Sequence, residues 1–259
     1  MPCGMAPFLL QKSSRHSGRR LAELTTRGME QYQDYYALIA IPVAYLLGSI
    51  PFSALIARLY GISDLRTVGS GNIGATNVWR AAGPFAGILA LLADLAKGVV
   101  AVLFAMIWSH SFEPILPGIL SKPLPYSIEL VWVLAAFAVI LGHVFPVFTR
   151  FKGGKGVATG LGAMITLMPI QTLIALGVFV VVVLISRFIS LGSILAALAF
   201  ATVLLVQRLA LLQEVPLSFV VAGVALAVLV LATHTQNIRR LIRGDENRFS
   251  SSRKANSHG

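Results

Sequence analysis

The sequence predicts an all-α, polytopic integral membrane protein with seven transmembrane helices. Of its 259 residues, 56% are hydrophobic and 12% are charged, and the mean hydropathy is +0.80. Soluble domains carry roughly a quarter charged residues, so a soluble domain of this size and a disordered chain are both excluded. The apolar residues also occur in blocks of about 20, which is long enough for a helix to cross roughly 30 Å of hydrocarbon.

The apolar segments predict the spans in order. Hydropathy marks residues 36–60, 84–108, 130–148, 157–186, 189–206 and 216–233. The fourth segment has about 30 residues, or roughly 45 Å as a helix, which is too long for one modestly tilted span. Because a proline removes a helix hydrogen bond, we expect two short helices with a tight turn at Met168 and Pro169. This division gives seven spans and puts the two chain ends on opposite sides.

Three regions are expected along the chain. Residues 1–34 form a polar amino-terminal extension, which we expect to be mobile and to hold no cleaved signal peptide, because no basic segment precedes its weakly apolar start. Residues 35–249 form the seven-helix membrane domain, and residues 250–259 form a polar cytoplasmic tail.

The basic residues predict the orientation. The chain has 21 Lys and Arg against 10 Asp and Glu, a net charge of +11. Most of them lie in the segments 61–81, 149–156, 187 and 239–254, whereas the opposite side holds Lys122, Arg208 and the extension. The positive-inside rule then places the carboxy terminus in the cytoplasm and the amino terminus outside. Because these charges lie in short connections, membrane topology and phosphate binding are favoured over a nucleic-acid partner.

The first polar cluster, residues 64–80, lies between spans one and two. Residues 69–74 match GxGxxG, but no strand precedes them, so the dinucleotide-binding fingerprint is excluded. We expect Asn77 to cap the next helix and Arg80 to lie in its first turn, so that bare N–H groups, the helix dipole and the guanidinium face one anion. A flexible interfacial loop is the alternative.

The second cluster, residues 143–159, lies between spans three and four. It is no Walker A loop, because Gly156 stands where a Ser or Thr would hold magnesium. Glycines next to Lys152 and Lys155 predict a backbone nest for phosphate, and the alternative is a positive-inside stop signal. For His143 we favour a structural hydrogen bond at a helix end over catalysis.

The third cluster, residues 187–193, opens span six. A serine that caps a helix after an arginine is ordinary, and this is the simpler interpretation of Ser190. The amino-terminal ends of spans two, four and six would nevertheless point from the same side. Three positive dipole ends together with the nearby cations predict a site for a multiply charged anion such as phosphate.

The fourth cluster, residues 234–248, follows span seven. His234 and Asn237 are three residues apart on a helix and share a face. A histidine has an unperturbed pKa of about 6.5, which suits acid–base work or hydrogen bonding to a substrate. A basic amphipathic tail on anionic lipid would explain the arginines but not His234, Asn237 and Glu246.

Two further observations bear on chemistry. Asp94 and Lys97 are three residues apart inside span two, where they form either a structural ion pair or a pair that orients substrate. Cys3 is the single cysteine, so no disulfide and no cysteine metal site are expected. We expect no metal and no cofactor.

At these clusters the sequence resembles the bacterial acyl-phosphate:glycerol-3-phosphate acyltransferase family, PlsY. Several motifs occur together in one order, which makes the resemblance specific. The matching stretches are GSIPF at 48–52, VGSGNIGATNVWR at 68–80, DLAKG at 94–98, HVFPVFTRFKGGKGVAT at 143–159, RFISLGS at 187–193 and HTQNIRRLIRGDENRF at 234–249. The amino-terminal extension and a long outer loop at about 109–128 depart from the family pattern.

The resemblance implies a seven-helix enzyme of the bacterial cytoplasmic (inner) membrane whose active site is on the cytoplasmic face. It implies transfer of an acyl group from acyl phosphate to the sn-1 hydroxyl of glycerol 3-phosphate, giving lysophosphatidic acid and phosphate. This is the first acylation of phospholipid synthesis. The partners would be both substrates, membrane lipid and a soluble enzyme that forms acyl phosphate.

The residues and the resemblance together give the candidate site. An acyl phosphate is already activated, so the protein needs to supply proximity, charge neutralisation and a proton acceptor more than a covalent nucleophile. The expected catalytic residues are His234, Asn237, Lys155 and Arg80, and the expected substrate-binding residues are Ser70, Gly71, Asn72, Asn77, Lys152, Gly153, Gly154, Ser190, Ser193 and Glu246.

A membrane transporter for an organic phosphate or another anion is the main alternative. It would share intramembrane charges and helix ends aimed at an anion, but its site should lie near the membrane midplane between repeated halves. Here the polar motifs gather on one face and no repeat is evident, which favours an enzyme. The acyltransferase class with Asp five residues after His is excluded, because Ile115, Phe148 and Arg239 stand at that offset from the candidate histidines.

Overall fold

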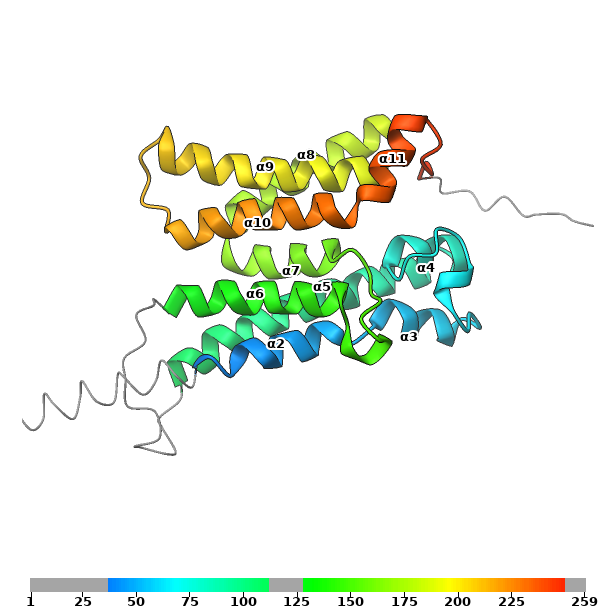
Figure 1. Ribbon diagram of the computed structural model, residues 1–259, viewed down its shortest axis with the longest axis horizontal. Helices are drawn as coiled ribbons and strands as arrows, with labels where there is room; N and C mark the ends of the chain where they lie inside the picture. Colours follow the sequence, from blue (N-terminus) through cyan, green and yellow to red (C-terminus); the bar gives the residue numbers. More distant parts are fainter. Residues whose placement is uncertain (1–36, 112–127, 250–259) are drawn as a thin grey trace, which may run out of the picture.

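The computed structural model describes residues 37–111 and 128–249, and these residues form helices without a strand (Figure 1). The expected extension 1–34, the loop centred on 112–127 and the tail 250–259 lie outside the described residues. The helices are α2 (Ala40–Ser49), α3 (Phe52–Leu59), α4 (Ala75–Ala82), α5 (Pro84–Ser111), α6 (Ile128–Val144), α7 (Val157–Leu167), α8 (Pro169–Ser186), α9 (Ile189–Leu209), α10 (Leu217–Thr233) and α11 (Thr235–Arg243), with short 3-10 turns η1 (Leu65–Thr67) and η2 (Val147–Thr149).

Long apolar helices make this an integral membrane fold. In the described part of the chain, five helical segments are long and apolar enough to cross a membrane, and α10 with α11, bent by 61°, makes a sixth. The α7 helix is apolar but only 11 residues long. The predicted interruption after Met168 is confirmed, because α7 ends at Leu167 and Pro169 is the first residue of α8.

The helices lie along one common direction and place their polar connections together. In Figure 1, α4, the connection before α7, and α11 lie toward the right-hand end, and the α9–α10 connection lies at the left-hand end. Helix α5 packs against α2, α6 and α7, whereas α9 packs against both α8 and α10. The fold therefore has two helix groups whose polar segments meet at one end.

The first group is held together by glycines at the helix crossings. A Cβ atom at Gly48 or Gly142 would collide with a backbone carbonyl oxygen where α2 crosses α6, and the same holds for Gly98 and Gly162 where α5 crosses α7. Lipid chains are as apolar as leucine side chains, so membrane helices associate through close packing of small residues. These crossings bring the backbones of α2, α5, α6 and α7 into direct contact.

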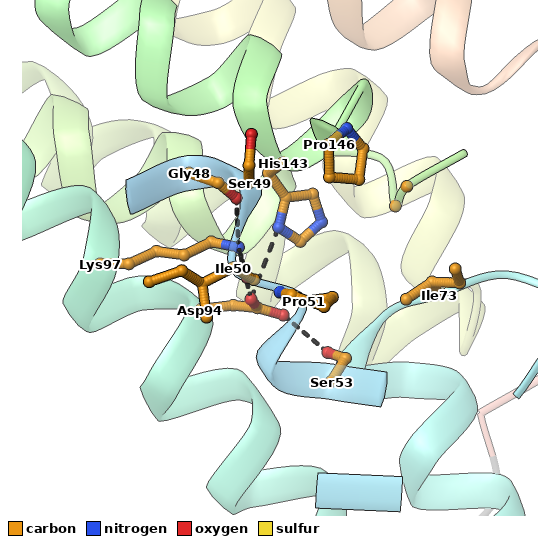
Figure 2. Close-up of a pocket in the computed structure, with 12 residues that line it drawn as sticks. Gly48, Ser49, Ile50, Pro51, Ser53, Ile73, Asp94, Lys97, His143 and Pro146 are labelled. Carbon is orange, nitrogen blue, oxygen red and sulfur yellow. Dashed lines mark hydrogen bonds and ion pairs between the residues drawn. The ribbon is translucent and has the colours of Figure 1, made fainter. Parts of the chain in front are cut away.

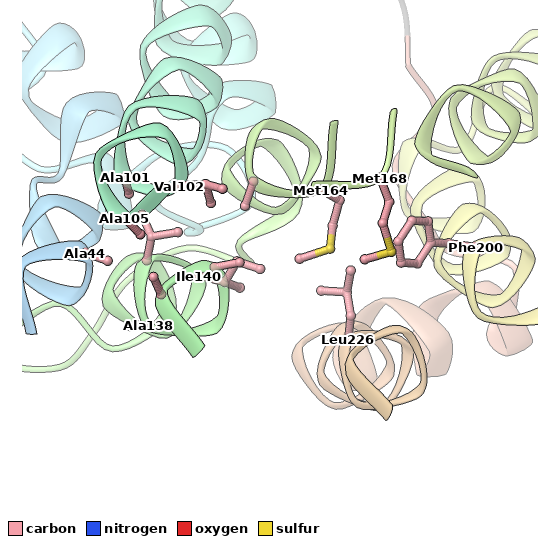
Figure 3. Close-up of a cluster of buried hydrophobic side chains, with 14 of the residues drawn as sticks. Ala44, Ala101, Val102, Ala105, Ala138, Ile140, Met164, Met168, Phe200 and Leu226 are labelled. Carbon is pink, nitrogen blue, oxygen red and sulfur yellow. The ribbon is translucent and has the colours of Figure 1, made fainter. Parts of the chain in front are cut away.

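The buried apolar cluster changes in character between the two groups. Small residues such as Ala44, Ala101 and Ala105 fill the space between α2, α5 and α6 (Figure 3). Between α7, α9 and α10 the cluster contains larger side chains, among them Met164 and Phe200. The first group is therefore closely packed, and the two groups are spaced by long side chains.

We predict that Gly142→Ala lowers the thermal unfolding temperature of the detergent-solubilised protein. The new Cβ would collide with the Tyr45 carbonyl oxygen at the α2–α6 crossing, and overpacking of such a contact costs about 1–3 kcal/mol. Gly177→Ala is the matched control, because a Cβ there meets no atom within 4 Å. That variant should keep or raise stability, since alanine favours helix. Equal unfolding temperatures for the two variants would contradict the role given to Gly142.

Candidate active site

A cavity of about 710 Å³ lies between the two helix groups. Residues 70–80, α5 and α7 line one side, and α8, α9, α10 and the segment 233–249 line the other. Charged and polar side chains occupy its end near α4 and α11, and apolar residues such as Leu176, Phe200 and Leu226 occupy its walls deeper along the helices. The cavity is therefore shaped for an amphipathic molecule with a charged head.

Arg80 stands at the charged end without a permanent partner. Its side chain projects from α4 toward the cavity, and it makes no hydrogen bond or ion pair with a described residue. Burial lowers the pKa of this guanidinium, Glu246 raises it, and the charge of Arg240 lowers it further. An arginine stays charged in spite of such a shift, so Arg80 is a cation available to an anionic ligand.

Lys155 also lines the charged end, on the same side of the cavity as Arg80. It immediately precedes Gly156, the residue that caps α7, and its Nζ donates a hydrogen bond to Asn237 Oδ1. Burial lowers the pKa of Lys155 to about 8, helped by Arg240 and Arg80 and opposed by Glu246. The amine is therefore charged at neutral pH but loses its proton far more easily than a surface lysine does.

Glu246 links the carboxy-terminal helices at this end. Asn237 Nδ2 donates to its Oε1 at 2.8 Å, Ser190 Oγ donates to the same oxygen at 3.1 Å, and Arg240 Nε donates to Oε2 at 2.7 Å. The pKa of Glu246 is lowered: burial alone would raise it, but the hydrogen bonds from Arg240, Asn237 and Ser190 outweigh that effect. A charged carboxylate therefore fixes Asn237 and Arg240 beside Lys155.

His234 lies at the bend between α10 and α11 and is only 2% exposed. Its Nδ1 is 2.8 Å from the Val230 carbonyl oxygen, so Nδ1 carries the proton and donates it there. In the neutral ring the other nitrogen, Nε2, is then an acceptor. Nε2 makes no hydrogen bond with any described residue, and His234 lines the cavity. It is therefore suited to accept a proton from a bound hydroxyl.

Three helix amino termini open into the cavity, as the sequence predicts, but the first of them belongs to a different helix. The first turns of α4, α7 and α9 contribute lining residues, among them Thr76, Ala158 and Ser190. The first N–H groups of a helix have no partner within the helix, and the dipole favours an anion there. The short α4 is separated from the long α5 by Gly83, so α4 rather than span two provides the first of these ends.

The expectations that Asn77 caps this helix and that Arg80 lies in its first turn are both wrong, because Arg80 lies in the last turn of α4. The capping position is Gly74, and Asn77 lies inside α4, 1% exposed. Its Oδ1 accepts from the Ser70 N–H at 2.9 Å, and its Nδ2 donates to the carbonyl oxygens of Leu65 and Val68. Asn77 therefore fixes the loop that carries Ser70, and with it Gly71 and Asn72, which also line the cavity.

The serines of the third cluster do not cap α9. Phe188 occupies the capping position, and no side chain caps the helix there. Ser190 instead donates to Glu246, and Ser193 Oγ donates to the Ile189 carbonyl oxygen at 2.9 Å. Both serines line the cavity, so the structure brings them together with Lys155 and Asn237.

The glycines of the second cluster have a different role from the predicted phosphate nest. The N–H groups of Gly153 and Gly154 donate to the carbonyl oxygens of Val144 and His143, both at 3.1 Å, because the end of α6 leaves those carbonyls unpaired. Neither glycine lines the large cavity, and Lys152 is exposed outside it. Among the residues of this loop, Lys155 and Gly156 reach the cavity.

Asp94 and His143 line the large cavity, and together with Lys97 they also surround a small cavity near the break between α2 and α3 (Figure 2). Asp94 and Lys97 form an ion pair of 3.0 Å, which confirms the structural interpretation; a role of Asp94 in orienting substrate stays a prediction. His143 Nδ1 lies 3.1 Å from Thr159 Oγ1, so the expected hydrogen bond at a helix end is also confirmed.

Sequence reasoning missed three residues at the charged end. Arg240 lies one helical turn after Asn237 on α11, and this spacing was a usable signal. Trp79 and Phe249 both line the cavity, and their ring centroids are 5.2 Å apart. Nothing in the local pattern indicates that contact, because the two residues come from opposite ends of the membrane domain.

Comparison with known proteins shows the family of the chain. A family model described as glycerol-3-phosphate acyltransferase matches residues 38–244. Among curated relatives named glycerol-3-phosphate acyltransferase, the one from Geobacter sulfurreducens is 44% identical over 214 residues, covering 82% of this chain and 97% of that protein. The relative from Trichlorobacter lovleyi is 45% identical over 213 residues, with the same coverage of both chains.

Solved structures give the same result. The crystal structure of PlsY, an integral membrane glycerol 3-phosphate acyltransferase, in its glycerol 3-phosphate form is 37% identical with a TM-score of 0.70, covering 83% of this chain and 96% of that chain. Its lysophosphatidic acid form is 35% identical with a TM-score of 0.68 and the same coverage. The family match, the relatives and the fold therefore show that this chain belongs to the glycerol-3-phosphate acyltransferase family.

Proposed function

We infer that this protein transfers the acyl group of an acyl phosphate to the sn-1 hydroxyl of glycerol 3-phosphate, which yields lysophosphatidic acid and phosphate. One observation carries this conclusion. A single cavity joins a cation-rich end, with Arg80 and Lys155, to apolar walls formed by α7, α8, α9 and α10. Acyl phosphate and lysophosphatidic acid each combine a fatty chain with a phosphate group, and both match that division.

The charged end supports binding of two phosphate groups. Arg80, Lys155 and the first turns of α4, α7 and α9 present positive charge and unpaired N–H groups to the same space. We assign Ser70, Gly71 and Asn72 to substrate contact at the loop that Asn77 fixes. We assign a second set of residues to the orientation of the acceptor, glycerol 3-phosphate, either by direct contact or by fixing the side chains that contact it. These residues are Ser190, Ser193, Asn237 and Glu246.

The chemistry requires no covalent intermediate. The acyl phosphate supplies a good leaving group, so holding the hydroxyl against the carbonyl carbon and neutralising the developing charge carry the reaction. The hydroxyl oxygen attacks the carbonyl carbon, the bond to the phosphate oxygen breaks, and phosphate leaves. We assign the hydroxyl proton to Nε2 of His234, the ring nitrogen that the helix leaves available.

We also propose how the chain crosses the membrane. Counting α7 as a short span gives seven crossings of alternating direction, with the amino terminus outside and the carboxy terminus in the cytoplasm. The basic connections that contain Arg66, Lys155 and Arg187 support placing the charged end on the cytoplasmic face of a bacterial inner membrane. There the cavity would receive acyl phosphate from a soluble enzyme that forms it.

A donor comparison tests the reaction. Purified protein in detergent is given radiolabelled glycerol 3-phosphate with palmitoyl phosphate, palmitoyl-CoA or palmitoyl acyl carrier protein in parallel. We expect labelled lysophosphatidic acid from palmitoyl phosphate alone, because the charged end is built around phosphate groups. Equal amounts of product from a thioester would contradict the assigned donor. If folded protein makes no product from any donor, the alternative function, a transporter for an organic phosphate or another anion, would be favoured.

The same assay in sealed vesicles tests the proposed face. Both substrates carry charge and cross a bilayer poorly, so inside-out vesicles should show activity without detergent. Right-side-out vesicles should show it only after permeabilisation. The reverse pattern would overturn the orientation while leaving the reaction intact.

Lys155→Met is expected to lower kcat/KM by about 10²–10³-fold, the usual loss when one group that stabilises developing negative charge is removed. Lys152→Met is the matched control, since Lys152 lies three residues earlier on the same loop but outside the cavity. It should retain activity close to that of the unmodified protein. The assay is the rate with palmitoyl phosphate at equal amounts of folded enzyme, and similar losses in both variants would remove the special role of Lys155.

The pH profile provides a further prediction. Because the pKa of Lys155 is lowered to about 8, its charged form predominates at pH 7 and disappears as the pH rises. We therefore expect kcat/KM to fall as the pH rises through about 8. Lys155→Arg keeps the charge over this range, so any activity it retains should stay level between pH 7 and 10. A profile that falls at the same pH in both proteins would assign the decline to another group.

A further inference from the structure

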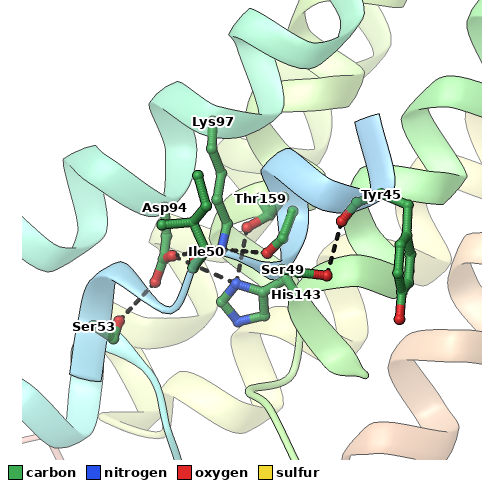
Figure 4. A network of polar contacts seen from close by, with 9 residues as sticks. Tyr45, Ser49, Ile50, Ser53, Asp94, Lys97, His143 and Thr159 are labelled. Atoms are coloured by element: carbon green, nitrogen blue, oxygen red, sulfur yellow. Dashed lines mark hydrogen bonds and ion pairs between the residues drawn. The ribbon is translucent and has the colours of Figure 1, made fainter. Parts of the chain in front are cut away.

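A buried polar network lies behind the loop that carries Lys155 (Figure 4). It joins the end of α2, the start of α3, the middle of α5, the end of α6 and the start of α7. None of its side chains has a role in the reaction described above. Its side chains are Ser53, Asp94, Lys97, His143 and Thr159. All of them are buried.

The Asp94 carboxylate is the centre of the network. Ser53 Oγ donates to its Oδ2 at 2.6 Å, and Lys97 Nζ lies 3.0 Å from its Oδ1. Lys97 also donates to the carbonyl oxygens of Gly48 and Ile50, both at 3.0 Å, where α2 ends. The lysine thus already neutralises the buried carboxylate, so charge pairing alone does not require a histidine beside it.

His143 connects this carboxylate to α7. Its Nδ1 lies 3.5 Å from Asp94 Oδ1 and 3.1 Å from Thr159 Oγ1. A carboxylate beside one ring nitrogen favours a proton on that nitrogen, although among the described residues Asp94 Oδ1 accepts no hydrogen bond. Thr159 is fully buried in the first turn of α7, four residues after Lys155. The imidazole is therefore held between α5 and the first turn of α7.

The same histidine also supports the residue before Lys155. The His143 carbonyl oxygen accepts the Gly154 N–H at 3.1 Å, and a Cβ atom at Gly154 would collide with the imidazole Nε2. The remaining space among these groups is a cavity of about 10 Å³, about enough for one water molecule. The imidazole consequently has little freedom to move away from the loop.

We propose that Asp94 and His143 are positioning residues for Lys155: Asp94 fixes the imidazole of His143, which holds Gly154 and Thr159 on either side of Lys155 and so keeps its amine at the charged end of the cavity. This rests on the proposed function only in that Lys155 binds the phosphate groups. The rival interpretation is a network that stabilises the fold and has no effect on the site.

Substitution of one hydroxyl separates these interpretations. Thr159→Val removes the partner of His143 and keeps the shape of the side chain, and Thr159→Ser keeps the hydroxyl. Thr166→Val is the matched control on the same helix, because Thr166 Oγ1 donates only to the Gly162 carbonyl oxygen within α7. We expect Thr159→Val to lower kcat about tenfold, as follows from loss of one buried hydrogen-bond partner. Thr159→Ser should restore kcat, and Thr166→Val should leave it unchanged.

Hydrogen exchange provides a readout that does not depend on activity. Amides of residues 150–158 should exchange faster in Thr159→Val than in Thr166→Val, because the hold on the loop is weakened. If Thr159→Val matches Thr166→Val in both kcat and exchange, the proposal is overturned. It is also overturned if Thr159→Val only lowers the unfolding temperature and leaves kcat and loop exchange unchanged.

A double-mutant cycle tests the part of Asp94. Asp94→Asn keeps the size of the side chain, and if it acts through the same imidazole as Thr159, adding Thr159→Val should cost less than it does alone. Independent, multiplying losses would exclude the path through His143. If the unmodified protein makes no lysophosphatidic acid, the proposed function fails, whereas the exchange measurements still decide whether the network holds the loop.

Discussion

An excess of positive charge in a partly enclosed space is the constraint on which the charged end of the cavity depends. Arg80, Lys155 and Arg240 surround one carboxylate, that of Glu246, so two positive charges remain unbalanced there. The nearby Asp94 does not reduce this excess, because Lys97 already neutralises it. Burial lowers the pKa values of Arg80 and Lys155, so their charged forms are less favoured here than in water. A dianionic phosphate would neutralise this excess, which is the basis for the proposed phosphate binding at this end.

Each of the two helix groups contributes a different part of this site. Glycine crossings hold α2, α5, α6 and α7 close together, so α7 is a rigid support for Lys155. Helices α9, α10 and α11 supply Ser190, His234 and Asn237 from the opposite wall, and Glu246 ties α9 to α11. The hydrogen bond from Lys155 to Asn237 spans the cavity and joins the two groups at its charged end. Small residues in one group and long side chains between the groups thus leave room for a fatty chain.

Much of this architecture could be predicted from local sequence, and the failures have a common physical cause. Segment length and one proline were sufficient to predict the break at Pro169, because both act within the segment. The order of the motifs between the predicted spans was sufficient to predict that most of the site residues meet at one end of the helices. The roles of Asn77 and Gly154 were misjudged because each depends on which distant backbone groups lack partners. Asn77 serves the carbonyls of its own loop and Gly154 serves the end of α6. A sequence motif does not indicate which backbone carbonyl groups lack partners.

The two buried histidines differ in role because their ring nitrogens have different hydrogen-bond partners. His234 gives its Nδ1 proton to a backbone carbonyl of its own helix, so its second nitrogen faces the cavity as an unengaged acceptor. His143 has Nδ1 between a carboxylate and a hydroxyl, and its Nε2 is pressed against the backbone at Gly154. In the proposed reaction the first ring accepts the proton of the substrate hydroxyl, and in the proposed network the second ring holds the chain on either side of Lys155. The end of α10 therefore supplies a group for proton transfer, and the end of α6 supplies the support for Lys155. A site that depends on the position of one lysine needs both.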